Sequence, residues 1–321
     1  MIEYIIGAGT LGAAALAAKI LNSEQAAPAL KIHHRPFPVE WRAILKDNWP
    51  LYSNLPDNLR EQLEQLTLVF LERIEIRGIE GLEITDEIRV LTASQACLLL
   101  VNRNTFFPSK LKSVVIRPSA YTATQTSSAG GIQGERDILV LGQSWENGLV
   151  LLSWDNTQTG AANTKDGRNL VLHEFAHQLD QADGVADGAP ILGSKEEYER
   201  WLEVCSRVFT DLKSKVEKGD KTLIDDYGAT NPAEFFSVVT ETFFEKPFYL
   251  KKTTARIVST LLRLLSGGSV ELVKNFTRQP KLAGEDLSVA VLVLFLTQPP
   301  EVCELSDGVA RNPWARHKSG R

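Results

Sequence analysis

The sequence predicts an α+β fold in which helices, a small mixed sheet and further helices follow one another along the chain. Apolar residues recur at helical spacing in two early segments, residues 59–76 and 87–102. Short runs rich in β-branched residues come next, at 113–116, 137–141 and 148–154. Helical patterns then return at 169–180, 195–218 and 232–244. Because strands and helices do not alternate, this order favours α+β over a doubly wound sheet.

Local sequence features support each of these elements in turn. Charged residues lie opposite the apolar face of the first helix, whereas the second is apolar around residues 96–101 and is expected to be buried. Gly78 and Gly81 mark the turn between them, and loops rich in Thr, Ser and Gly separate the three strands. Asn231 as N-cap and Pro232 at the first helical position predict the start of the last helix.

Composition is that of an ordinary globular protein, and the net charge argues against a nucleic-acid-binding protein. Of the 321 residues, 43% are hydrophobic and 23% are charged, which is enough for one large core or two small ones. The 35 Lys and Arg residues and 40 Asp and Glu residues give a net charge of -5. Because no strong positive field surrounds such a chain, we expect no nucleic-acid partner.

The cysteines point to a reducing compartment. Cys97, Cys205 and Cys303 are odd in number and widely spaced. This spacing favours neither a disulfide framework nor a thiolate metal site. We therefore expect a cytoplasmic protein.

An apolar segment at the amino terminus qualifies the expected cytoplasmic location. Residues 4–18 are apolar and free of charge, but a membrane-spanning helix needs about 20 such residues. The segment lacks the basic start of a secretory signal. We therefore expect a hydrophobic leader at residues 1–35, through which residues 4–21 can associate the protein with a membrane.

Three glycines in this leader match a dinucleotide-binding fingerprint. Gly7, Gly9 and Gly12 have the G-x-G-x-x-G spacing. The context is unfavourable, because only three residues could form the preceding strand and no acidic ribose ligand follows near residue 30. A dinucleotide-dependent enzyme therefore stays the weakest alternative.

The strongest chemical signal is an H-E-x-x-H sequence within the helical segment 169–180. His173 and His177 are four residues apart, so in a helix both imidazoles project from one face, about 6 Å apart along the axis. That arrangement suits two nitrogen ligands of one zinc ion. Glu174 would lie beside the metal, where its carboxylate can take a proton from a water that the metal activates.

A catalytic zinc of this kind needs a third protein ligand. The other histidines, His33, His34 and His317, lie far away in the terminal segments. Glu234, at the start of the apolar helix 232–244, is the natural candidate. The alternative is that Glu234 only complements the dipole of its own helix.

Three further residues are candidates for supporting roles. Asp180 and Glu241 stay on the metal-facing sides of their helices, where either could accept a hydrogen bond from a ligand imidazole. The alternative for both is a solvent-facing charge. Tyr227 could hydrogen-bond a developing oxyanion, or it could be an ordinary loop tyrosine.

These motifs together resemble the Mlc titration factor A family of zinc-dependent peptidases. The likeness covers residues 36–248 and rests on ordered stretches of sequence: 82–87, 95–99, 142–145, 173–180, 226–236 and 240–244. Such a series is far more specific than H-E-x-x-H alone. Residues beyond 248 are not part of the resemblance.

The resemblance implies a zincin-like, gluzincin-type core that is similar to the catalytic domain of anthrax lethal factor. It implies His173, His177 and Glu234 as zinc ligands, Glu174 as general base and Tyr227 as an aid to the transition state. It also implies aminopeptidase activity on small substrates. The enterobacterial member of the family binds the glucose repressor Mlc, but no residue here encodes a surface for that partner.

We therefore predict a zinc metallopeptidase with one Zn²⁺ per chain that cleaves short peptides. The expected domains are a leader at 1–35, a peptidase domain at 36–248, and a helical extension at 249–321 with a disordered basic tail. The strand 148–154 is expected to be the sheet edge that pairs with substrate backbone. The alternatives are a regulatory protein that sequesters a transcriptional repressor, and a protease at the membrane surface.

Overall fold

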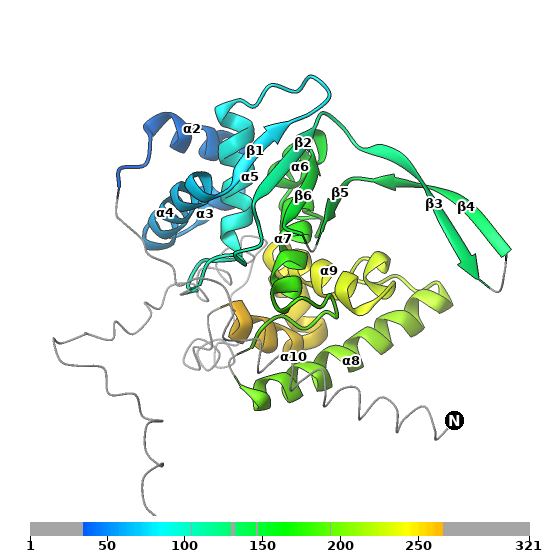
Figure 1. The fold of residues 1–321 in the computed structure, drawn as a ribbon. Coiled ribbons are helices and arrows are strands. Elements are labelled where there is room, and N and C mark those ends of the chain that lie inside the picture. Colours follow the sequence, from blue (N-terminus) through cyan, green and yellow to red (C-terminus); the bar gives the residue numbers. More distant parts are fainter. Residues whose placement is uncertain (1–34, 104, 130–131, 146, 193, 266–321) are drawn as a thin grey trace, which may run out of the picture.

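The computed structural model describes residues 35–265, apart from residues 104, 130–131, 146 and 193 (Figure 1). It confirms the α+β fold. The first half contains four helices among the described residues: α2 (Val39–Asn48), α3 (Pro50–Asn54), α4 (Asp57–Arg73) and α5 (Asp86–Leu98). The sequence predicted the last two nearly in place, but α2 and α3 were missed because Pro38, Pro50 and Pro56 interrupt their helical pattern.

The main sheet is mixed, as predicted. Its strand order is β1-β2-β6-β5, in which β1, β2 and β6 are parallel and β5 is antiparallel to β6. The strand bounds are β1 (Glu75–Gly78), β2 (Ser113–Arg117), β5 (Gly142–Ser144) and β6 (Leu149–Ser153). The prediction that 148–154 forms the edge is wrong, because β6 pairs with β2 on one side and with β5 on the other. The edge strand is β5.

A long hairpin separates β2 from β5. Its strands β3 (Tyr121–Ala129) and β4 (Ile132–Val140) pair antiparallel and form a two-stranded sheet of their own. Figure 1 shows this hairpin extending away from the body of the molecule. The expectation that 137–141 belongs to the main sheet is therefore wrong, because these residues pair with the chain immediately before them.

The second half of the described chain consists mainly of helices. They are α6 (Trp154–Ala162), α7 (Leu170–Asp180), α8 (Lys195–Lys218), α9 (Pro232–Glu245) and α10 (Pro247–Leu265). Side chains at three N-caps accept backbone N–H bonds: Asn169 from Leu172, Ser194 from Glu197, and Asn231 from Glu234. The predicted cap at Asn231 and the proline at the first position of α9 are thus confirmed.

One hydrophobic core joins the two halves through α7. The ring of Phe175 in α7 lies 5.6 Å from that of Phe70 in α4 and 5.0 Å from that of Phe107, measured between centroids. Fully burying a phenylalanine contributes roughly 1.5–3 kcal/mol, so this contact holds α7 firmly against the first half. The apolar face of α10 belongs to the same core, and the expected domain boundary at residue 248 falls within this helix.

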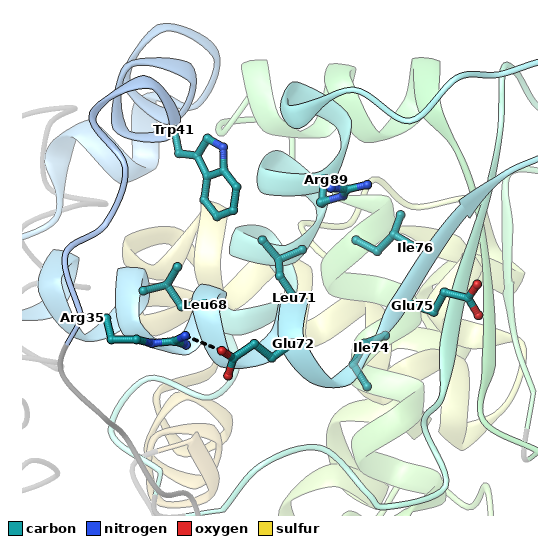
Figure 2. A pocket seen from close by; sticks show the side chains of 9 residues that line it. All are labelled: Arg35, Trp41, Leu68, Leu71, Glu72, Ile74, Glu75, Ile76 and Arg89. Atoms are coloured by element: carbon teal, nitrogen blue, oxygen red, sulfur yellow. Dashed lines mark hydrogen bonds and ion pairs between the residues drawn. The ribbon is translucent and has the colours of Figure 1, made fainter.

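A surface pocket lies near β1, at the opposite edge of the sheet from β5. Its volume is about 440 Å³, and Figure 2 shows its apolar lining, which includes Trp41, Leu68 and Leu71. An ion pair between Arg35 and Glu72 closes one end. None of the predicted site residues lines this pocket.

The predicted membrane association needs correction. A spanning helix requires about 20 largely apolar residues. Within residues 35–265 as described, no helix is both long and apolar enough to cross a bilayer. The segment 4–21, on which the prediction was based, and the glycine fingerprint of Gly7, Gly9 and Gly12 lie outside the described residues.

Candidate metal centre

Two histidines of α7 form the first part of the site. His173 and His177 lie one helical turn apart, and their ring centroids are separated by 4.9 Å with the planes at 79°. Both side chains are largely buried, with exposed fractions of 13% and 11%. The helix therefore presents both imidazoles on one face, as the i, i+4 spacing predicted.

The first turn of α9 brings Glu234 to the same place. Its Oε2 lies 3.0 Å from Nε2 of His173 and 3.3 Å from Nε2 of His177. One donor atom from each of the three residues can be chosen so that all lie within 4.8 Å of one another. The structure thus joins the two halves of the predicted ligand set.

Gly188 contacts the end of α7, the side of α8 and the start of α9, and so links the three helices. Asp180, the last residue of α7, accepts a bond from the backbone N of Gly188 at 3.0 Å. The carbonyl of Gly188 accepts one from Nε1 of Trp201 in α8 at 2.9 Å. A Cβ at position 188 would lie only 2.2 Å from the carbonyl oxygen of Pro232, the first residue of α9. The contact of Asp180 is thus with the loop that supports the site.

The donor set fits a metal cation. Oε1 of Glu241 lies 2.7 Å from Nδ1 of His173, on the far side of the ring from Glu234. When Nδ1–H donates to Glu241, Nε2 carries a lone pair that faces a carboxylate oxygen 3.0 Å away. A proton or a metal ion between the two acceptors would satisfy both, and imidazole nitrogens with a carboxylate oxygen suit a divalent metal.

The electrostatics of the cluster agree with this interpretation. Burial works to lower the pKa of His173, but its contacts with Glu234 and Glu241 raise that pKa well above the usual value. Burial works to raise the pKa of Glu234, but the contacts with the two histidines lower it to about 2. The site therefore attracts positive charge.

Glu174 lies beside the cluster and against the sheet edge. The residue is buried, and a Cβ built on Gly142 of β5 would lie 2.8 Å from its Oε1. Burial raises the pKa of Glu174 to about 8, and the nearby Glu234 and Glu241 add to the effect while His173 opposes it. A carboxyl group with such a pKa can both accept and donate a proton near neutral pH.

Tyr227 lies beside the ring of His173. It belongs to the short 3₁₀ turn η3 (Asp226–Ala229), and its ring centroid is 6.0 Å from that of His173. The side chain is exposed, unlike the rest of the site. Burial of the hydroxyl, followed by the charges of Glu234 and Glu174, raises the pKa of Tyr227 to about 12. The phenol is therefore a hydrogen-bond donor at neutral pH.

Sequence reasoning singled out Glu241 but missed Glu245, and both residues of α9 hold the start of α7. Glu241 accepts a bond from the backbone N of Asn169, and Glu245 accepts from those of Gly167 at 2.9 Å and Arg168 at 3.1 Å. The sequence did offer one signal for Glu245, because it follows Glu241 at i, i+4 spacing in an apolar helix.

The strand edge is fastened to α7 in a similar way. Nε2 of Gln178 donates to Oγ of Ser144 at 2.6 Å. Glu174 and Gln178 are one turn apart and meet Gly142 and Ser144, which are two residues apart on β5. The edge strand therefore runs along α7, and no local pattern in the sequence indicated this contact.

The fold and this donor set are those of a metallopeptidase with a zincin-like core. The chain belongs to the glucose-regulated metallo-peptidase M90 family, whose model matches residues 22–264. This confirms the resemblance found in the sequence.

Several curated proteins are similar to the chain. An uncharacterized protein of Synechocystis sp. is 37% identical over 233 residues, which covers 72% of this chain and 85% of that protein. Mlc titration factor A of Klebsiella pneumoniae is 29% identical, with 62% of this chain and 75% of that protein covered. The Cronobacter sakazakii protein of the same name is 27% identical, with 65% and 79% covered.

Proposed function

We propose that this protein is a zinc-dependent aminopeptidase that hydrolyses short peptides. His173, His177 and Glu234 are its metal ligands and Glu174 is its general base. The observation that carries the proposal is the convergence of two imidazoles and one carboxylate from α7 and α9, with a buried second carboxylate between the cluster and a sheet edge. A structural metal site would have no need for that second carboxylate.

The donor chemistry supports zinc as the metal. Two imidazoles and one carboxylate leave room in the coordination sphere for a reactant, as in catalytic zinc sites. When bound, zinc supplies a Lewis acid that polarises the scissile carbonyl and lowers the pKa of water. Glu241 holds His173 in the tautomer that presents Nε2 to the metal.

Glu174 moves the proton in this proposal. It takes a proton from the attacking water and delivers it to the nitrogen of the leaving amine. A bound dication favours the charged form of this carboxyl, which burial otherwise disfavours. Its position against Gly142 keeps the carboxylate at the sheet edge, where a substrate would lie.

Tyr227 donates a hydrogen bond to the oxyanion that develops on the scissile carbonyl. Its ring lies beside that of His173, and its raised pKa keeps the phenol protonated throughout the working range of pH. Such donors act most strongly where charge develops in the transition state.

The backbone of β5 offers a place for the peptide. Leu141 accepts from the N of Ser153, and the N of Trp145 donates to Leu149, so these residues face β6. In an antiparallel pair the intervening residues, Gly142 and Ser144, turn their N–H and C=O groups away from the sheet. An extended substrate can pair with them by β-augmentation.

The restriction to a free amino terminus follows from the family resemblance in the sequence, and substrate kinetics test it. The experiment compares amino-acyl p-nitroanilides with the same compounds blocked at the amino group, using wild type and Glu174→Gln at equal zinc content. We expect hydrolysis of the free-amine compounds only, and its loss in the variant. Full activity of Glu174→Gln would overturn the mechanism.

Repressor binding is the second candidate function. Relatives named Mlc titration factor A include the two described above, at 27% and 29% identity. If sequestering a repressor were the main function, Glu174→Gln would still retain a purified Mlc repressor on a column, and wild type would show no peptidase activity. The same pair of proteins thus separates the two functions.

A further inference from the structure

An arginine two residues before α7 joins the start of this helix to the turn that carries Tyr227. The backbone N of Arg168 is held by Glu245 of α9 at 3.1 Å. Its guanidinium donates from Nε and Nη2 to Oδ2 of Asp225, the former at 2.8 Å. Arg168 is therefore fixed at its main chain and reaches across to the segment before η3.

The other oxygen of Asp225 holds the turn itself. Oδ1 accepts a bond from the backbone N of Tyr227 at 3.0 Å, and the carbonyl of Asp225 accepts from the N of Gly228 at 3.0 Å. One carboxylate thus connects the guanidinium of Arg168 with the main chain of Tyr227. The connection runs from α9 through the start of α7 to η3.

Tyr227 needs such support more than the other site residues do. Tyr227 is 54% exposed and is carried by a turn of four residues, whereas His173 and His177 are held by a buried helix. A displacement of about 1 Å in a catalytic group can lower the rate roughly 100-fold. The phenol acts only if the turn is held at a fixed distance from the metal ligands.

We propose that Arg168 and Asp225 are positioning residues that hold Tyr227 beside His173 for oxyanion stabilisation. This inference rests on the proposed role of Tyr227. Because the guanidinium is largely exposed, the ion pair contributes little to the stability of the fold. Removing this ion pair should therefore change the position of Tyr227 without unfolding the protein.

A double-mutant cycle on the zinc-loaded full chain tests the proposal. The variants are Arg168→Met, Tyr227→Phe and the double variant, with kcat and KM measured on the amino-acyl p-nitroanilide that wild type cleaves fastest. We expect Arg168→Met to lower kcat by about 10-fold or more at unchanged KM and zinc content. The double variant should be no slower than Tyr227→Phe alone. Losses that multiply in the double variant would overturn the inference, as would full activity of Tyr227→Phe or Arg168→Met.

Two further variants sharpen the cycle. Arg168→Lys keeps the charge but loses the fork that binds Asp225, so we expect it to restore only part of the rate. Arg256→Met is the matched control, because Arg256 forms an exposed ion pair with Glu203 at 3.5 Å, and should leave kcat unchanged.

Hydrogen exchange gives a readout that does not depend on activity. Arg168→Met should speed amide exchange in residues 225–230, while Arg256→Met should not. Unchanged exchange in this segment would overturn the proposal whether or not the protein hydrolyses peptides. Faster exchange in a protein that cleaves none of the substrates would support the role of Arg168 in holding residues 225–230. It would contradict the proposed peptidase function.

Discussion

The carboxylate of Glu241 contacts His173 at one oxygen and the first residue before α7 at the other. Oε1 lies 2.7 Å from Nδ1 of the imidazole, and Oε2 accepts a bond from the backbone N of Asn169. A single side chain of α9 thereby fixes both the start of α7 and the orientation of one ring on it. The orientation of the candidate ligand His173 and the packing of α7 against α9 are coupled through this residue.

Glu241→Ala should weaken zinc binding. The variant loses the acceptor that orients His173, and loss of such a partner typically costs 10- to 100-fold in metal affinity, so we expect about that range. Competition with a chromogenic chelator measures the effect. Glu241→Gln keeps a carbonyl acceptor and should lose less. Equal affinity of wild type and Glu241→Ala would show that the contact does not support the metal.

Gly142→Ala should lower activity without removing the metal. The new methyl would lie 2.8 Å from Oε1 of Glu174 and 2.8 Å from Cδ1 of Leu170, both of which must move. Because a displaced general base loses its alignment, we expect kcat to fall by roughly 10- to 100-fold. Steady-state kinetics at measured zinc content checks this.

The control for this variant comes from the same strand. Gln143 is exposed, and its side chain lies on the opposite face of β5 from Gly142. Gln143→Ala should therefore retain the wild-type kcat. A similar loss in both variants would mean that β5 is disturbed as a whole, and would contradict the specific contact with Glu174.

The stability of the protein should depend on pH through Glu245. Burial, followed by the charges of Asp166 and Glu241, raises its pKa from the ordinary value of 4.5 to about 9. Between these values the folded protein holds a proton that the unfolded chain has released. The free energy of unfolding therefore falls as pH rises through this window, by about 1.4 kcal/mol per pH unit at most.

Glu245→Gln removes this titration and keeps a carbonyl acceptor for the backbone N of Gly167 and Arg168. We expect the melting temperature of the variant, relative to wild type, to rise between pH 5.5 and 8.5. Thermal denaturation of both zinc-saturated proteins across that range measures it. A difference that stays constant with pH would mean that Glu245 ionises normally in the folded state.

The sequence predicted those features that depend on local geometry. His173, Glu174 and His177 could be placed together because helical periodicity alone puts i and i+4 on one face. Glu234 was found because Asn231 and Pro232 define the start of α9 and hence its first turn. The α+β class followed from the order of helical and β-branched segments.

The features that sequence reasoning missed are tertiary or too short to leave a pattern. The edge strand β5 has only three residues, none of them β-branched, so β6 was taken as the edge in its place. The contact between Gly142 and Glu174 and the bond between Arg168 and Asp225 join residues far apart in the chain. Periodicity carries no information about such pairs.

Gly188→Ala should destabilise the protein and weaken zinc binding. Gly188 has φ +76°, and a Cβ there would lie 2.2 Å from the carbonyl oxygen of Pro232. The backbone at the start of α9 must therefore move, and with it Glu234. Gly219→Ala is the matched control, because its φ is +73° but an added Cβ meets nothing within 4 Å. We expect the control to cost about 1 kcal/mol through backbone strain alone, and Gly188→Ala to cost at least about 2 kcal/mol more. Urea denaturation and chelator competition measure the two effects. Equal stability of the two variants, with wild-type zinc affinity in both, would show that Gly188 does not set the position of Glu234.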